Sequence, residues 1–450
     1  MRSSQQLTVV TLTAAALMLL YPAVSSAENG AEAPAASAER IVVSIADRQL
    51  RLLLEEVLER NPGIARLHFE AAAAEQRAPQ VKGPPDPVAS LTWWVMPPQT
   101  RTGPQQAAVS ISQRLPWFGT LKLREQAALW EAAAARARVE AARLEAVTEV
   151  RTDYLELYFL DRERRIVGDQ IATLEHYSQL ALARYASGVG IDQTVIKIDA
   201  EITRSRARLV TIAERRATIV ARLNALRDRP QTTPIAVSSG ATEVPRLEPD
   251  LEALRELALA SRPEMAAAAA AVEAASVRQE LAHTTTKPDL VFALNYGFVG
   301  PRDDAAGRLN PPEGDGDDVL GLSAGLSLPV WRAAVGAAAE EGVQRRLAAE
   351  EGRREAAAVI DRELGELTHR LPLLAEQVDL YGGVLATQAR ASLDSAESAY
   401  AAGTAGALDL LDAERVVLQV RVASERARTD LAVAWARLEG AVAAPLEVGS

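Results

Sequence analysis

The chain contains no cysteine, and only 4% of its 450 residues are aromatic. Without cysteine, neither a disulfide nor thiol chemistry is possible. Large aromatic side chains supply much of the burial in compact cores, yet apolar residues still make up 48% of this chain. Alanine-rich runs at 71–74 and 266–271 provide part of that share. This composition favours closely packed helices over a thick globular core.

Features of catalysis and of metal binding are also scarce. The four histidines are scattered without the spacing of a metal-ligand motif, and neither a nucleophile elbow nor a phosphate-binding glycine loop is present. The net charge of −11 argues against nucleic acid as a partner. We therefore expect neither an enzyme nor a cofactor or metal site.

The N-terminal segment resembles a secretory signal peptide. Arg2 precedes an apolar stretch from Leu7 to Tyr21, Pro22 ends it, and small residues up to Ala27 offer a cleavage site. An uncleaved anchor helix is the alternative, but the stretch is shorter than the ~20 residues that cross a bilayer. We predict a signal peptide at 1–27, followed by a flexible lead-in at 28–40.

The rest of the chain contains an internal repeat. Five ordered landmarks of one half recur in the other, which chance matches between alanine-rich helices do not explain. The pairs are Asn61-Pro62 with Arg262-Pro263, Pro85-Asp86 with Pro288-Asp289, Leu115-Pro116-Trp117 with Leu328-Pro329-Val330-Trp331, Tyr185-Ala186-Ser187-Gly188 with Tyr400-Ala401-Ala402-Gly403, and Asp199-Ala200-Glu201 with Asp412-Ala413-Glu414. Each half then has the order helix, hairpin, long helix, turn and helix.

The repeat sets the predicted domain boundaries. The first repeat covers 41–228 and the second covers 250–440, leaving a tail at 441–450. Between them, 229–249 is rich in proline, with a Ser-Ser-Gly step, and is predicted to be a linker. The helix-to-helix turns fall at about 188 and about 403.

Two hairpins are predicted, at about 86–116 and about 289–330. Apolar residues alternate with small or polar ones over 290–298 and 320–328, which indicates strands with one apolar and one polar face. A half-buried sheet on a soluble core gives the same alternation. Runs of this length also suit tilted strands in a bilayer, and the signal peptide favours that alternative. Four strands cannot close a barrel, so a membrane location requires oligomerisation.

Aromatic residues cluster in or just beyond these strands, where an aromatic belt at a membrane interface would lie. They are Trp93, Trp94, Trp117, Tyr296 and Trp331. Ordinary packing residues are the alternative interpretation.

Two long helices are predicted, at about 121–185 and about 332–400. If continuous, each would span on the order of 100 Å, which no compact domain needs. Pro372 and Gly382-Gly383 interrupt the second helix and predict a bend or a change of register.

Taken together, these residues resemble the TolC-like family of trimeric outer-membrane efflux ducts. The specific matches are the duplicated layout, Asn61-Pro62, the Leu-Pro-Trp-Phe-Gly run at 115–119, and the segment from Tyr400 to Glu414. The resemblance implies a mainly α fold with a transmembrane β-barrel. Four strands from each chain would close a 12-stranded barrel in a homotrimer, continued by a long α-helical coiled-coil barrel in the periplasm.

The resemblance also assigns the narrow end of the duct. Asp409 and Asp412 match the family's aperture acids, and three copies would form acidic rings that select cations. Capping of the final helix is the alternative role. Family members often carry a basic residue where this chain has Ala405, so its closing network is left open, with Arg184 and Arg415 as candidates.

Glycines mark the two helix-to-helix turns, where they end helices. By resemblance, these tips dock on a periplasmic adaptor protein. The residues are Gly188, Gly190, Gly403 and Gly406.

The predicted function is a passive export duct in the outer membrane of a Gram-negative bacterium. Its partners would be a periplasmic adaptor (membrane fusion) protein, a proton-driven inner-membrane pump, two further copies of the chain, and outer-membrane lipid. The 115–119 run resembles the heavy-metal branch, although no His or Met cluster would hold a soft metal. A multidrug or secretion duct, or a soluble periplasmic coiled-coil structural or adaptor protein, is the alternative.

Overall fold

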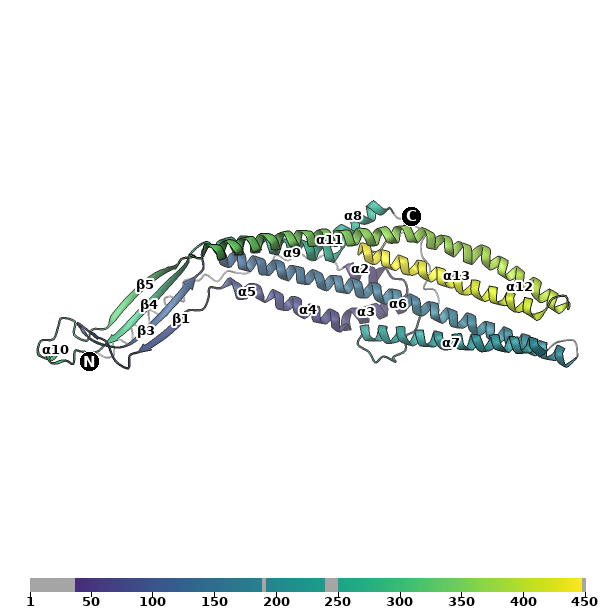
Figure 1. Ribbon diagram of the computed structural model, residues 1–450, viewed down its shortest axis with the longest axis horizontal. Helices are drawn as coiled ribbons and strands as arrows, with labels where there is room; N and C mark the ends of the chain where they lie inside the picture. Colours follow the sequence, from purple (N-terminus) through teal and green to yellow (C-terminus); the bar gives the residue numbers. More distant parts are fainter. Residues whose placement is uncertain (1–36, 188–191, 239–249, 447–450) are drawn as a thin grey trace. The chain divides into compact units, whose positions relative to one another are not determined.

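The computed structural model describes residues 37–187, 192–238 and 250–446 (Figure 1). The first half contains α2 Ser37–Ser44, α3 Arg48–Arg60, α4 Pro62–Glu75, α5 Arg77–Lys82, β1 Val88–Trp93, β2 Gln99–Thr100, β3 Gly103–Leu115, α6 Thr120–Ala186 and α7 Asp192–Leu226. The second half contains α8 Leu251–Ser261, α9 Pro263–Thr284, β4 Asp289–Val299, α10 Ala305–Leu309, β5 Val319–Ser327, α11 Arg332–Asp379, the π-helix η1 Leu380–Leu385, α12 Ala386–Ala401 and α13 Ala407–Val442. The signal peptide predicted at 1–27 lies outside the described residues.

The Asn61-Pro62 landmark begins α4 for a local reason. The Asn61 side chain accepts a hydrogen bond from the Ile64 N–H at 3.0 Å, and Pro62 occupies the first turn, where its missing N–H is not needed. The Asn61 amide also donates to the Leu226 carbonyl at 2.9 Å. The same side chain therefore starts one helix and fastens it to the end of another.

The strands form one antiparallel sheet in the order β1-β3-β4-β5, with the short β2 paired to β3. Each half of the chain supplies two adjacent strands of this path, and β3 and β4 join the two halves, with Leu115 opposite Leu290. Among the described residues, β1 and β5 each pair along one edge only. The sheet is therefore open at both sides.

The register separates the side chains into an apolar and a polar face. Leu91, Val109, Tyr296 and Leu320 lie opposite one another across the strands and share one face. On the apolar face, Leu322 is 86% exposed and Trp93 is 72% exposed. No described element therefore covers these side chains.

The opposite face carries small and polar side chains. Ser90 and Ser110 share a hydrogen bond of 2.8 Å, and the Asn295 amide donates to the Ser323 hydroxyl at 3.3 Å. Arg114 forms an ion pair with Asp289 on the same face. Polar groups on this face thus find partners across the strands.

The helices follow the order of the strands (Figure 1). Helix α5 leads into β1, β3 into α6, α9 into β4, and β5 into α11. Helix α6 packs against α4 and α5 as well as against α9, which in turn packs against α11. Farther from the sheet, α6 packs against α7 and α13, and α13 packs against α11 and α12. This pattern of contacts is that of a wall one helix thick.

Ion pairs fix the register of α13 on α6. Arg162 donates to Glu425 at 2.9 Å, Glu156 accepts from Arg426 at 2.5 Å, and Arg151 pairs with Glu439. Several of these side chains are mostly buried, where pairing avoids an uncompensated charge. The two antiparallel helices are therefore held at several points along their length.

Burial is divided among separate clusters. One joins α2, α3, α6 and α7, a second joins α8, α11 and α13, and a third lies near the α12–α13 turn. Small residues permit close approach between helices. A Cβ on Gly440 of α13 would lie 2.3 Å from the Thr148 hydroxyl of α6.

Three sequence predictions require correction. Residues 37–40, expected in a flexible lead-in, begin α2, where Ala38 is buried. The tail expected from 441 includes the last turn of α13 and the buried Ala443 and Ala444. Pro372, expected to interrupt the second long helix, lies inside α11 without ending it. The change of register expected at Gly382-Gly383 is confirmed, because both residues lie in η1.

The break at η1 follows from its sequence. Gly382 and Gly383 lower the helix propensity, and no residue of η1 is buried, so little packing opposes a local rewinding. None of the described helices is long and apolar enough to cross a membrane.

Candidate functional site

The candidate site lies where α6, α12 and α13 meet, at the end of α6 remote from the sheet (Figure 1). Gly403 takes a φ of +76°, which closes the turn between α12 and α13. The N–H of Gly403 donates to the Tyr400 carbonyl at 3.1 Å, and that of Thr404 donates to the Ala399 carbonyl at 3.0 Å. Glycine is favoured here because other residues are strained at positive φ.

Gly406 immediately precedes α13, in an extended conformation. Its N–H donates to the Asp409 carboxylate at 3.0 Å, so Asp409 caps the N-terminus of α13. Gly188 and Gly190, the corresponding glycines of the other turn, lie outside the described residues. The adaptor-docking role of these turns stays a prediction.

Asp409 and Asp412 are both exposed at the start of α13. Asp412 accepts a hydrogen bond from Arg415 at 3.1 Å, and its side chain remains 72% exposed. The structure therefore gives Asp409 the capping role that was the alternative in the sequence, without removing its charge from the surface. Their aperture role stays a prediction.

Arg415 connects α13 to α7. Its guanidinium donates to Glu201 at 2.8 Å as well as to Asp412. The Glu201 side chain is only 8% exposed and also accepts from Arg204 on its own helix at 2.6 Å. A buried carboxylate shared in this way makes Arg415 a cross-link between two helices.

Arg184 makes a second cross-link, from α6 to the end of α12. It donates to the Tyr400 carbonyl at 3.0 Å and to the Ala401 carbonyl at 3.3 Å. Its guanidinium also lies over the Tyr400 ring, 4.5 Å from the centroid. A cation here satisfies the last carbonyls of α12 and offsets the negative end of its dipole.

A third connection is a pair of carboxylates around Tyr177 of α6, of which Glu414 is buried and Glu397 is exposed. The Tyr177 hydroxyl lies 2.5 Å from Glu397 of α12 and 3.3 Å from Glu414 of α13. Burial raises the pKa of Glu414 above its usual range, and the nearby Glu397 adds to this. Burial likewise raises the pKa of Tyr177, which therefore stays a hydrogen-bond donor.

The sequence did not single out Tyr177 or Glu397, because either could sit on a solvated helix face. The sequence does carry a signal for two other acids of the site. Glu201 and Glu414 close the repeated Asp-Ala-Glu landmark, and both are buried acids that bind a side chain of another helix. Recurrence at the same repeat position distinguishes these acids from scattered ones.

The predicted interface aromatics fall at two ends of the sheet. Trp93 ends β1, with Trp94 directly after it, and Tyr296 lies near the distal end of β4. Trp117 and Trp331 lie where strands give way to α6 and α11. Trp93 and Trp331 are exposed, whereas the other three are partly buried. Their membrane role stays a prediction.

In the described part of the chain, no group of three or more histidine or acidic residues could hold a metal ion. The polar groups of the site instead connect helices to one another.

The order of strands and helices is that of the subunit of an outer-membrane efflux channel. The model of the outer membrane efflux protein family matches residues 53–227 and 254–444. The chain belongs to this family, and the resemblance noted in the sequence is confirmed.

Solved channels share the fold. The outer-membrane channel OprN is 18% identical, with a TM-score of 0.76, and the match covers 89% of this chain and 91% of OprN. The outer membrane protein VceC of Vibrio cholerae is 20% identical, with a TM-score of 0.75, 92% of this chain covered and 100% of VceC. CusC is 17% identical, with a TM-score of 0.71, 89% of this chain covered and 93% of CusC. No curated protein matches the sequence.

Proposed function

We propose that three copies of this chain form the outer-membrane duct of a tripartite efflux system. The observation that carries the proposal is a wall one helix and one strand thick, open along both edges, with an uncovered apolar sheet face. A single such wall leaves strand edges unpaired and apolar side chains in water, so it is incomplete without further copies.

Closure of the sheet into a barrel would account for the outer edges of its two edge strands, β1 and β5, which are unpaired within the described residues. Pairing β5 of one copy with β1 of the next would satisfy the free backbone groups of both edges. With four long strands in each chain, three copies give a 12-stranded barrel, as in the trimeric ducts that the sequence resembles. The helix wall, which keeps the strand order, would then close into a periplasmic tunnel.

The two faces of the sheet match such a barrel. The apolar face, with Leu91, Leu320 and Leu322, would contact lipid, and the polar face, with Ser110 and Asn295, would line a wet lumen. Trp93 pairs with Ala107, and about ten residues of extended chain separate this level from Trp117. At ~3.4 Å per residue and ~40° of tilt, the two aromatic groups would be roughly 25 Å apart, the height of an apolar barrel band.

The tip of the helices is the proposed gate. Three copies of Asp409 and Asp412 would form acidic rings that favour cations. Arg415 and Arg184 would hold the tip closed. They would replace the basic residue that family members often carry at the position of Ala405. Docking of a periplasmic adaptor on the turns at Gly403, Gly406, Gly188 and Gly190 would loosen these links.

Transport through this duct would need no chemical step by the chain itself. A proton-driven inner-membrane pump would supply the energy, and the cargo would diffuse through the lumen. Acidic rings favour cationic cargo, of which metal ions are one class. The similarity to CusC concerns the fold alone and does not choose between metal, multidrug and protein cargo.

The test combines location, assembly and conduction. We expect the protein in the outer-membrane fraction, as a trimer that dissociates only on heating, and as a cation-selective channel in planar bilayers. Deletion of the gene should increase sensitivity to metals, dyes or detergents. Recovery as a soluble periplasmic monomer would instead favour a coiled-coil structural or adaptor protein and would overturn the duct.

A further inference from the structure

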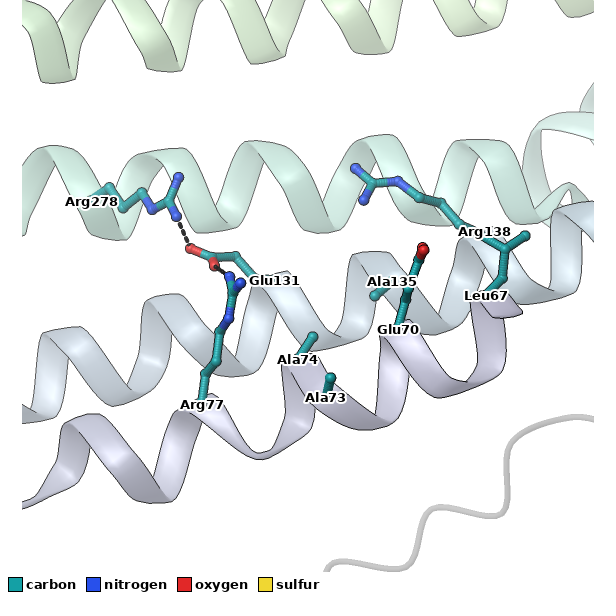
Figure 2. Close-up of a pocket in the computed structure, with 9 residues that line it drawn as sticks. All are labelled: Leu67, Glu70, Ala73, Ala74, Arg77, Glu131, Ala135, Arg138 and Arg278. Carbon is teal, nitrogen blue, oxygen red and sulfur yellow. Dashed lines mark ion pairs between the residues drawn. The ribbon is translucent and has the colours of Figure 1, made fainter. Parts of the chain in front are cut away.

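A hollow of about 480 Å³ lies between α4, α5, α6 and α9, away from the helix tips (Figure 2). Small side chains leave the space open, namely Ala73 and Ala74 on α4 and Ala135 on α6. Leu67 of α4 extends the apolar part of the lining. The hollow therefore has an apolar wall wide enough for a short alkyl chain.

The polar part of the hollow is dominated by arginine. Arg77 of α5 and Arg278 of α9 point toward Glu131 of α6 from opposite sides (Figure 2). Both pair with this one carboxylate, Arg77 at 3.8 Å and Arg278 at closer range. One acid cannot neutralise two guanidinium groups, so a positive charge remains uncompensated here.

Arg138 adds a further positive charge. It lies seven residues after Glu131, and therefore on the same face of α6. It pairs with no carboxylate among the described residues. Glu70, the other acid of the lining, pairs with Arg66 at 2.5 Å. An excess of arginine is notable in a chain whose net charge is −11.

We propose that this hollow binds an amphiphilic anion. Arg138, with Arg278 or Arg77, would hold a phosphate or carboxylate head through forked charge-assisted hydrogen bonds. The alkyl part would lie along Leu67 and the alanines. The ligand is either a phospholipid or a free amphiphile that enters from solution. The two sources share the same head-group chemistry.

The test titrates octyl phosphate into the purified trimer in a neutral detergent, by calorimetry. Replacing one charge-assisted contact should weaken binding about tenfold in Arg138→Gln, whereas Arg138→Lys should retain part of the affinity. Arg136→Gln is the matched control, because Arg136 pairs with Glu75 at 2.8 Å and does not line the hollow. It should bind as the wild type does, and octyltrimethylammonium should not compete.

Equal loss in the Arg136 and Arg138 variants, or equal binding of the cationic amphiphile, would overturn the proposal. Native mass spectrometry of the trimer distinguishes the sources. A phospholipid retained by the wild type and lost from Arg138→Gln indicates a membrane lipid. Octyl phosphate binding without retained lipid indicates a free amphiphile. Binding is measured independently of conduction, so its failure would leave the duct function untouched.

Discussion

At the scale of single residues, the buried acids of the wall differ in how well they are paired. Within the described part of the chain, Asp153 on α6 has one ionic partner, Arg222 of α7, at 3.2 Å. Burial raises the pKa of Asp153 to about 6, and the nearby Glu149 and Glu156 add to the rise that Arg222 opposes. Its ionisation therefore costs more in the folded chain than in the unfolded one.

The raised pKa of Asp153 makes the stability of the fold depend on pH. Since the folded state binds the proton more tightly, ionisation of Asp153 destabilises the fold as the pH rises from about 4 through about 6. Two units of pKa correspond to about 3 kcal/mol. We expect Asp153→Asn to gain stability relative to the wild type between pH 4.5 and pH 7.5, measured as the shift in melting temperature of the trimer.

Asp161→Asn is the comparison for that experiment. Asp161 accepts from Arg216 at 2.8 Å across the same helix pair, so removing its charge should lower the melting temperature at pH 7.5. A fall of similar size in Asp153→Asn at this pH would contradict the assigned cost of burial.

Asp409 and Asp412 carry the residue-scale prediction about selectivity. In the double variant Asp409→Asn, Asp412→Asn, the carboxylates lose their charge while an amide oxygen can still accept the Gly406 N–H. Block by multivalent cations in single-channel recordings should weaken about tenfold or more, because the proposed rings lose six charges in a trimer. Glu355→Gln, an exposed acid on α11, serves as the control. Unchanged block in the double variant would remove both acids from the aperture.

At the scale of elements, the tip is held by side chains that join different helices. Arg415 links α13 to α7, Arg184 links α6 to α12, and Tyr177 links α6 to both α12 and α13. Fewer links of this kind should allow the helix ends to separate.

Arg415→Ala tests this at one link. It should raise the open probability of single channels, since the α13–α7 contact to Glu201 is lost. Arg204→Ala is matched, because Arg204 binds the same carboxylate at 2.6 Å but lies on the same helix as Glu201, and it makes no hydrogen bond to another helix within the described residues. If the open probability rises equally in both variants, then gating depends on the charge balance around Glu201. The cross-link between α13 and α7 would then have no role in gating.

The sequence anticipated the elements better than their contacts. The helix at 120–186 and the strands at 289–299 and 319–327 follow from alternation and apolar periodicity, which are local signals. The partner of Arg415 could not be found in this way. Many exposed acids compete for it, and only the packing of α13 against α7 brings Glu201 within reach, 214 residues away.

At the scale of the whole molecule, the uncovered apolar face of the sheet needs an apolar environment that a single chain does not provide. Leu322 lies near the middle of β5 on that face, and Ser323 lies on the opposite one. The two neighbours should therefore respond differently to the same charge.

Leu322→Arg should reduce the yield of heat-dissociable trimer in the outer membrane, because an arginine near the midplane on the lipid side costs about 2–4 kcal/mol. Ser323→Arg should assemble nearly as well as the wild type, since its side chain would face water in the lumen. The comparison is made by gel mobility of unheated membrane samples. The opposite ranking would reverse the assigned faces.

The sequence alone determined the family, the duplicated layout and the two-faced strands, because each depends on short motifs, on their order along the chain or on the alternation of neighbouring residues. Tertiary structure decided which surfaces stay open. A wall one helix thick appears only when α6 is seen between α5 and α9, and between α7 and α13. It also decided that Asp409 caps a helix and that three arginines of different helices surround one hollow, because such contacts depend on packing between distant segments.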